Sequence, residues 1–242
     1  MNKSLVKGSF CSGEYMEQIK INDRLLTAVQ FAREGKKLAD IGTDHAYLPI
    51  YLVNMGIITS AIAADINQGP LDKAQENIAK YGFEENIKTV LCDGLAKIDL
   101  NEVDDIAIFG MGGELIVKII DEATWLKDFN KRLILQPMTH PEKLREYLAK
   151  NGFYIIGETL SSDRGKIYQT ICASYDGIVR EYDAFTYAFG EHILKNKNNL
   201  LVEILDITKK KLERKICGKQ DGGEDVSYEM NMLEKINKYI ER

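Results

Sequence analysis

The chain has 242 residues, a formal net charge of −5, 45% hydrophobic residues and 29% charged residues. This size fits one domain of ordinary size with an appendage, and the composition supports a real hydrophobic core. No apolar run approaches the roughly 18 residues of a membrane span, and the N-terminus lacks the apolar segment of a secretory signal, so we expect a cytoplasmic protein. The four cysteines and three histidines show no metal-ligand spacing, which argues against a metal site.

Strands and helices are expected to alternate after an irregular stretch of about 20 residues. A first helix should begin near Asn22 or Asp23, since either residue can cap it. The hydrophobic pattern predicts strands at 37–41, 60–65, 87–91, 105–109 and 132–135, and helices at 47–53, 71–81, 113–123 and 141–151. Two last strands, 153–159 and 167–174, flank the short polar turn SSDRG and should therefore be antiparallel. Five βα units that end in such a hairpin favour a Rossmann-like α/β fold of the methyltransferase type.

The C-terminal part changes to a helical pattern. Apolar residues recur every three or four positions over 201–216 and 226–240, on either side of the polar segment 218–225. This predicts an antiparallel, coiled-coil-like helical hairpin and divides the chain into domains 1–175 and 176–242. Residues 191–219 carry eight basic against four acidic side chains, which indicates either a solvated helix face or a surface for nucleic acid.

The loop after the first strand is the first candidate ligand site. In a doubly wound sheet, ligands bind at the carboxyl ends of the strands, where Asp40 and Gly42 lie. Pro49 must lie in the first turn of the next helix, so that helix begins no earlier than about Ala46. The loop has one glycine followed by an acid, Asp44, and does not match GxGxxG. A carboxylate there repels a diphosphate and suits the ammonium of a methionine moiety, which favours S-adenosylmethionine (SAM) over NAD; the alternative is that Asp44 only caps the helix.

The next two strand ends carry further acids. Asp65 stands 25 residues beyond Asp40, where an acid accepts hydrogen bonds from ribose hydroxyls; the alternative is that it caps the following helix, and its position relative to the first loop favours the ribose role. Asp93 is placed to accept from an adenine amino group, and Gly94 lets backbone approach the ring. The candidate cofactor-binding residues are Asp40, Gly42, Asp44, His45, Asp65, Ile66, Asn67, Asp93, Gly94 and Gly110.

The fourth and fifth strand ends face the expected substrate side. The segment FGMGGE at 109–114 implies backbone that either turns tightly or contacts a ligand. It lacks the Asn/Asp-Pro-Pro-aromatic motif that braces an exocyclic amine, which argues against adenine N6 as the target. The segment LQPM ends the fifth strand and places Gln136, Pro137 and Met138 at the cleft, although methionine is more often core filler.

Several of these segments together resemble one family. ADIGTDHAYLP, AADIN, CDG, FGMGG, LQPM, ETLSSDRGKIYQ and the terminal hairpin are similar to consecutive motifs of the bacterial tRNA (adenine-22-N1)-methyltransferases, the TrmK family, over about residues 22–242. The resemblance implies a Rossmann-like domain, a coiled-coil C-terminal domain, SAM as methyl donor and adenine 22 of tRNA as acceptor. Adenine N1 has an in-plane lone pair, so catalysis should rest on alignment and electrostatics without a general base.

Roles follow from this resemblance as expectations. The candidate catalytic residues are Asp44, His45, Gly110, Met111 and Gly112. The candidate substrate-binding residues are Arg24, Tyr47, Gln136, Pro137, Met138, Asp163 and Arg164, with Tyr168 as a further aromatic platform. Lys166, next to Arg164 in the turn between the last two strands, could likewise reach phosphate or a base. The alternatives are a surface ion pair for Arg24, Arg164 and Lys166, a backbone-bonded loop histidine for His45 and a place in the core for the tyrosines.

Two other functions remain open at this point. The chain could methylate a small molecule, with the hairpin as a lid or dimer contact, or it could bind SAM and RNA without turnover. The sequence does not fix the oligomeric state, although a monomer is favoured, and it predicts tRNA as the partner with neither membrane nor metal.

Overall fold

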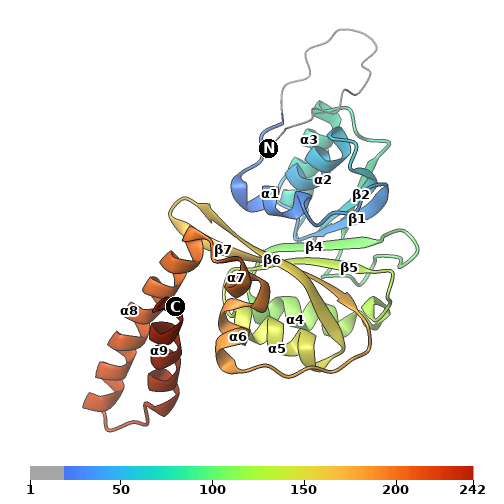
Figure 1. Cartoon of the computed structure of the whole chain (residues 1–242). Coiled ribbons are helices and arrows are strands. Elements are labelled where there is room, and N and C mark those ends of the chain that lie inside the picture. The colour runs from blue at the N-terminus through green and yellow to red at the C-terminus, as the bar shows by residue number, and fades with distance from the viewer. Residues whose placement is uncertain (1–18, 242) are drawn as a thin grey trace, which may run out of the picture.

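The computed structural model describes residues 19–241, so the expectation for the first 20 residues falls almost wholly outside the described part. Most strands are followed by a helix, as expected, although β3 is followed directly by β4 and β6 directly by β7 (Figure 1). In chain order the elements are α1 (Asp23–Val29), β1 (Lys36–Ile41), α2 (Tyr47–Asn54), β2 (Ile58–Asp65), α3 (Gln68–Lys80), β3 (Ile87–Leu91), β4 (Asp105–Met111), α4 (Gly113–Glu122), the 3-10 turn Thr124–Leu126, β5 (Arg132–Pro137), α5 (Pro141–Lys150), β6 (Phe153–Asp163), β7 (Lys166–Tyr175), α6 (Ala184–Phe189), α7 (Glu191–Asn196), α8 (Asn199–Asp221) and α9 (Ser227–Ile240).

The seven strands form one sheet in the order β3-β2-β1-β4-β5-β7-β6. Strands β1 to β5 are parallel, and β7 is antiparallel to both β5 and β6. The chain reverses direction across the sheet between β1 and β4, which makes their carboxyl ends the topological switch point where such sheets bind ligands. This topology confirms the Rossmann-like fold expected from the sequence.

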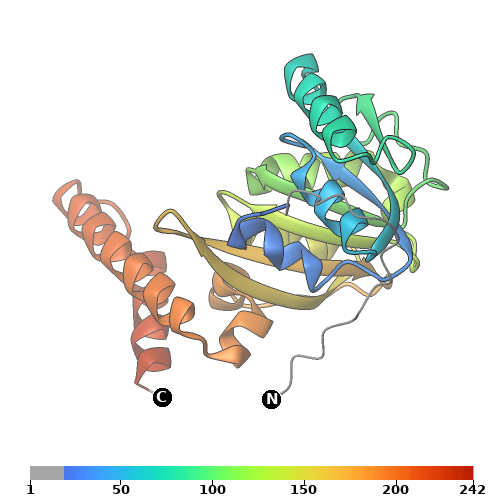
Figure 2. The same ribbon diagram turned by 90° about the horizontal axis from the view of Figure 1, so that it is seen from above.

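Helices cover both faces of the sheet (Figures 1 and 2). Alternate residues of the central strands point to opposite faces, because side chains alternate along a strand. Ala39, Ile106 and Ile108 pack beneath α4 and α5, whereas Leu38 and Ala107 pack beneath α1, α2 and α3. Both clusters are almost fully buried, so the sheet gives the strand ends a rigid base.

A third apolar cluster joins the C-terminal helices to the sheet. Leu160 of β6 is buried together with Phe185, Phe189, Leu201 and Ile236. The helices α8 and α9 run antiparallel and project away from the sheet and its covering helices (Figure 1). Within residues 19–241, no helix combines the length and the apolar character that a bilayer span requires.

Four local predictions differ from the structure. The segment SSDRG is not a five-residue turn, because residues 161–163 pair in β6 and only two residues connect β6 to β7. The helix α3 begins at Gln68 and not at Leu71. The short helices α6 and α7 were not predicted at all. The predicted turn at 218–225 begins too early, since α8 continues to Asp221.

Candidate functional site

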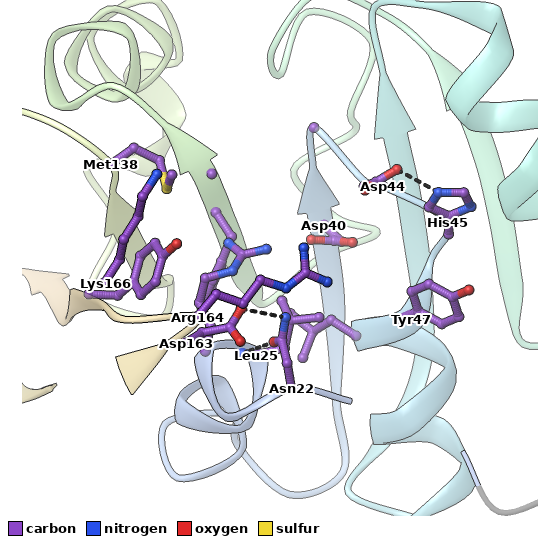
Figure 3. A pocket seen from close by; sticks show the side chains of 16 residues that line it. Asn22, Leu25, Asp40, Asp44, His45, Tyr47, Met138, Asp163, Arg164 and Lys166 are labelled. Carbon is purple, nitrogen blue, oxygen red and sulfur yellow. Dashed lines mark hydrogen bonds and ion pairs between the residues drawn. The ribbon is translucent and has the colours of Figure 1, made fainter. Parts of the chain in front are cut away.

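A cleft of about 720 Å³ opens at the switch point (Figure 3). It lies over the carboxyl ends of β1 and β4 and reaches from the β1–α2 loop to the β6–β7 hairpin. Its lining residues are Asn22, Arg24, Leu25, Asp40, Gly42, Asp44, His45, Tyr47, Leu48, Phe109, Gly110, Met138, Asp163, Arg164, Lys166 and Tyr168. Twelve of the candidate residues are therefore brought together: Arg24, Asp40, Gly42, Asp44, His45, Tyr47, Gly110, Met138, Asp163, Arg164, Lys166 and Tyr168.

The β1–α2 loop holds an unusual backbone. Gly42, His45 and Ala46 all have positive φ angles, of 72°, 67° and 56°. Side chains other than glycine rarely adopt this region, so His45 and Ala46 must be held there by their surroundings. Asn77 of α3 donates a hydrogen bond of 3.0 Å to the carbonyl oxygen of His45. The neighbouring helix thus fixes the loop that edges the cleft.

Gly42 also lies close to a neighbouring side chain. A Cβ atom on Gly42 would stand 2.2 Å from the methyl carbon of Met111. Met111 itself does not line the cleft but packs against the core cluster beneath α4. The Cβ-free backbone therefore leaves room for close packing on one side and for ligand approach on the other.

Asp40 is a buried carboxyl at the floor of the cleft. Its side chain accepts a 2.7 Å hydrogen bond from the Thr43 hydroxyl, and only 7% of the residue is exposed. Burial raises the pKa of Asp40 from 3.8 to about 6, while the Thr43 hydrogen bond and the positive charge of Arg24 act in the opposite direction. A cation bound next to Asp40 would be stabilised by the ionised carboxylate.

Asp44 and His45 form a pair at the rim. The Nε2 atom of His45 lies 3.0 Å from Oδ1 of Asp44, and the imidazole stacks on Tyr47 with 5.5 Å between ring centroids. The alternative role of Asp44 as a helix cap is wrong, because α2 is capped at Ala46 without a side-chain hydrogen bond. The alternative for His45 is also wrong, since its ring bonds to Asp44 and not to backbone. Tyr47 lies at the rim with 37% of its surface exposed, which places it outside the core.

Arg24 belongs to a polar network beneath the cleft. Its Nη1 donates to Oε1 of Gln136 over 3.1 Å, and its guanidinium lies 5.7 Å from the centre of the Tyr168 ring. Gln136 also donates to the Arg24 carbonyl oxygen and to the Thr170 hydroxyl. The suggested surface ion pair for Arg24 is wrong, because no acid pairs with it among residues 19–241.

Two residues predicted to face the substrate are buried instead. Gln136 has no exposed surface, and Pro137 is buried as well. The side-chain amide of Gln136 donates hydrogen bonds to α1 and β7, so Gln136 supports Arg24 from below and is not open to the cleft. Met138, by contrast, is 44% exposed at the cleft, so its expected role as core filler does not hold.

The glycines of FGMGG serve two purposes. Gly110, with φ of 77°, faces the cleft. A Cβ atom on Gly113 would stand 2.3 Å from the carbonyl oxygen of His140, and the Gly113 amide donates to the Thr139 carbonyl oxygen. Gly112 is the N-cap of α4 and does not line the cleft. The turn therefore contacts a ligand site at one end and packs tightly against the β5 end at the other.

The remaining predicted cofactor residues lie beside the cleft and do not line it. They are Asp65, Ile66, Asn67, Asp93 and Gly94. Oδ1 of Asp65 accepts a 2.7 Å hydrogen bond from the Asn67 amide in the turn before α3, which leaves Oδ2 available. The alternative role of Asp65 as a helix cap is wrong, because the N-cap of α3 is Asn67 and no side chain caps the helix. Asp93 is exposed at the end of β3 and lines a separate hollow against α4.

Charges of both signs line the cleft. Asp40 and Asp44 lie on the side of the β1–α2 loop and Lys166 lies on the side of Met138, with Asp163 and Arg164 between them (Figure 3). The carboxylates suit a cationic ligand and the cations suit an anionic one. Within residues 19–241, no three His, Cys, Asp or Glu residues are grouped in a way that would hold a metal ion.

Sequence reasoning missed four residues that line the cleft. Leu25, Leu48 and Phe109 are apolar residues of α1, α2 and β4, and nothing in the sequence distinguishes them from core residues. Asn22 caps α1 through a hydrogen bond to the Leu25 amide, as expected, but it also donates over 3.3 Å to Asp163. No local pattern links residues 141 positions apart, so this contact could not be predicted.

Comparison with known proteins gives consistent results. The family model "Methyltransferase domain" matches residues 21–171. The tRNA (adenine(22)-N(1))-methyltransferase of Bacillus subtilis is 34% identical over 192 residues, which are 78% of this chain and 81% of that protein.

Solved structures agree over nearly the whole chain. The Streptococcus pneumoniae protein Sp1610 in complex with S-adenosyl-L-methionine has a TM-score of 0.81 at 33% identity, covering 91% of this chain and 99% of that one. M. capricolum TrmK in complex with S-adenosyl-homocysteine has a TM-score of 0.78 at 28% identity, covering 91% of this chain and 98% of that one. The fold, the cleft and these likenesses together place the chain in the tRNA (adenine(22)-N(1))-methyltransferase family, the family of TrmK.

Proposed function

We propose that this chain transfers a methyl group from SAM to N1 of adenine 22 in bacterial tRNA. The observation that carries the proposal is the 34% identity over 192 residues to a Bacillus subtilis enzyme of that name. The cleft at the switch point adds support, because it is lined both by carboxylates suited to a cationic donor and by cations suited to an anionic acceptor. A substrate of this kind also implies that the enzyme works in the bacterial cytoplasm.

The residues of the β1–α2 loop fit SAM. The buried carboxyl of Asp40 and the exposed carboxyl of Asp44 can neutralise the ammonium and sulfonium charges. The Cβ-free backbone of Gly42 and Gly110 lets a ligand approach closely. When bound, SAM supplies an electrophilic methyl group.

The adenosine half of SAM requires the neighbouring strand ends. Asp65 has one carboxylate oxygen left after the Asn67 hydrogen bond, and we assign it to the ribose hydroxyls. Ile66 and Asn67 would flank the ribose, and Asp93 with Gly94 would meet the adenine ring. His45 is assigned a supporting contact from the rim, where its pairing with Asp44 orients both side chains.

The methyl transfer requires no covalent bond between the protein and either reactant. Adenine N1 is unprotonated at neutral pH, so the residues of the cleft need only align it with the methyl group and stabilise the positive charge that the ring gains. The carbonyl oxygens of residues 110–112 and the carboxylates of Asp44 and Asp163 are the groups we assign to that charge. Of these, Gly110, Asp44 and Asp163 line the cleft.

The target base must leave its stack to reach the cleft. N1 lies on the Watson–Crick edge, so the nucleotide has to be rotated out at a cost of a few kcal/mol. Tyr47 at one rim and Tyr168 near Arg24 are the aromatic rings on which the base can stack. Met138 would contact the base from the β5 end.

The test is methyl transfer from labelled SAM to an unmodified tRNA transcript, compared with a transcript in which adenine 22 is replaced by guanine. We expect label in the first transcript and none in the second. Equal label in both transcripts would mean that the enzyme methylates a nucleotide other than adenine 22. If neither transcript is labelled although the enzyme still binds SAM, the methyl acceptor is a different molecule.

A further inference from the structure

The β6–β7 hairpin extends beyond the rest of the sheet. Strand β7 pairs with β5 only from Ile171 to Ser174, whereas β6 and β7 pair with each other as far as Asp163 and Lys166. Residues 159–170 thus form a two-stranded arm, which we call the β6–β7 arm. The arm projects towards the side of the molecule that carries α8 and α9 (Figures 1 and 2).

The β6–β7 arm is held firmly on both faces. Leu160 and Ile167 pack against Phe185 and Leu201 of the C-terminal helices. On the other face, the hydroxyls of Thr170 and Thr27 are 2.7 Å apart, which ties the arm to α1. The tip of the arm therefore has a fixed place at the mouth of the cleft.

The tip itself carries a strained residue. Arg164 and Gly165 are the two connecting residues, and both have positive φ angles, of 48° and 73°. A two-residue hairpin turn with both angles positive prefers Asn-Gly or Gly-Gly, because an L side chain is strained there. A functional role for the side chain would explain an arginine at this strained position, because backbone strain of this kind is concentrated at functional sites.

Two cations at the tip have no acidic partner in the described part of the chain. Arg164 and Lys166 both line the cleft and are both exposed. Neither forms an ion pair with any of residues 19–241, whereas other exposed lysines such as Lys150 and Lys195 do. The acid that directly precedes Arg164 in sequence, Asp163, accepts a hydrogen bond from Asn22. Lys166 lies on the side of Met138, across the cleft from Asp44 and His45 (Figure 3).

We propose that Arg164 and Lys166 form a phosphate clamp that holds the RNA backbone beside the flipped target nucleotide. This inference rests on the proposed function and assigns the tip of the β6–β7 arm a role in it. A nucleotide that turns into the cleft brings its flanking phosphates to the mouth, where a guanidinium can bind phosphate in two-pronged fashion and an ammonium can add a second charge.

The test uses the full chain with Arg164→Asn and Lys166→Gln, singly and together. Arg164→Asn removes the charge and supplies the residue that the turn prefers, so this variant should fold at least as well as the wild type and melt slightly higher. Lys127→Ala, at the opposite end of β5, is the control for loss of an exposed cation. The measurements are the melting temperature, the Kd for SAM and the Kd for tRNA at several salt concentrations.

We expect tRNA binding to weaken at low salt by about tenfold or more in the double variant, and the slope of log K against log salt to fall by about one for each cation removed. The Kd for SAM and the behaviour of Lys127→Ala should stay at wild-type values. An unchanged salt slope would overturn the clamp. Weaker SAM binding with unchanged tRNA binding would also overturn it, since Arg164 would then serve the cofactor carboxylate.

The outcome is separable from that of the proposed function. If the wild type methylates adenine 22 and the double variant keeps its tRNA affinity and salt slope, the clamp fails and the function stands. If the wild type binds no tRNA at any salt concentration, both proposals fail together.

Discussion

Asp40 combines burial with a position where a positive charge is useful. Its pKa of about 6 lies above the ordinary value of 3.8, because burial disfavours the charged form. The folded chain therefore holds a proton on Asp40 at pH values where the unfolded chain has lost it. The stability that Asp40 contributes is fully present below about pH 4 and is lost as pH rises through about 6. A cation bound beside Asp40 has the opposite effect and favours the ionised carboxylate.

The first prediction concerns the pH dependence of SAM binding. If SAM binds the ionised form of Asp40, its Kd should fall about tenfold between pH 5 and pH 7 and then level off, because protonation competes with binding below a pKa of about 6. Calorimetric titrations at half-unit intervals measure this. Asp40→Asn should bind SAM weakly and without the pH dependence, and it should be more stable than the wild type at pH 7 by up to roughly 3 kcal/mol. A steep profile that survives in Asp40→Asn would assign the titration to another group.

The second prediction concerns Asp65. Replacing its carboxylate by the amide of Asn removes a charged acceptor from the assigned ribose contact, which is worth about 1.5–3 kcal/mol, so SAM should bind roughly 10- to 150-fold more weakly. Asp128 accepts the amide hydrogen of Asn130 over 2.8 Å, in the same local arrangement as Asp65 with Asn67. Asp128→Asn is therefore a matched control far from the cleft. Undiminished affinity in Asp65→Asn would remove the ribose role.

At the scale of elements, a buried ion pair joins α5, β6 and α6. Arg145 donates from Nε to Glu158 over 2.6 Å, and its remaining nitrogens reach the Tyr187 carbonyl oxygen and Gln169. The side chains of the pair are 2% and 0% exposed. Glu158 also accepts the His192 amide hydrogen. The pair thus sets where the C-terminal helices begin on the sheet.

The third prediction follows from this burial. Arg145→Met should destabilise the fold by about 3–5 kcal/mol, because it leaves a charged or protonated Glu158 without its partner. The double variant Arg145→Met with Glu158→Met should be less destabilised than the sum of the two single changes, which denaturant midpoints can measure. Lys150→Ala, which breaks the exposed pair with Glu146, should cost less than about 1 kcal/mol. Additive losses in the double variant would contradict the coupling.

The elements also mark where sequence reasoning was sufficient. Strands β1 to β5 were predictable, since each is a short apolar run bounded by turn residues. The helices α6 and α7 have six residues each, less than two turns, so they produce no periodic signal. The segment SSDRG was interpreted as a turn because its residues are polar. Part of it is strand, since the β6–β7 arm extends beyond the sheet and one of its faces is polar. In the site, the expected strand order was sufficient to predict that Asp40, Gly42 and Gly110 lie at the cleft. The burial of Gln136 depends on packing between α1 and β7, which no local sequence pattern predicts.

At the scale of the whole molecule, fewer cations of residues 191–219 are free to bind RNA than the number of basic residues indicates. Lys195 and Lys210 pair with acids one turn away on their own helices. Lys215 and Lys219 both pair with Glu229 of α9 and hold its pKa at about 2. These cations stabilise the α8–α9 hairpin itself. Lys197, Lys211 and Arg214 remain exposed without an acidic partner among residues 19–241.

The fourth prediction separates paired from unpaired cations on α8. Lys211→Gln with Arg214→Gln should weaken tRNA binding and lower the salt slope by about two, because two phosphate contacts are lost, while the Kd for SAM stays unchanged. Lys210→Gln is the matched control, since its ammonium already lies 2.7 Å from Asp206 and has less to offer a phosphate. Binding of tRNA at graded salt concentrations measures both.

A salt slope that stays at the wild-type value in the Lys211 and Arg214 variant would remove α8 from the RNA-binding surface and leave the β6–β7 arm as the contact nearest to the cleft. A loss of equal size in Lys210→Gln would mean that the helix acts through its total charge and not through particular phosphate contacts. The expected pattern, with a loss only for the unpaired cations, would mean that one tRNA contacts α8 and the cleft together. The arm packs between them against Leu201 at the start of α8, so the fixed geometry of α8 and the arm would then set the distance from the tRNA body to the target nucleotide.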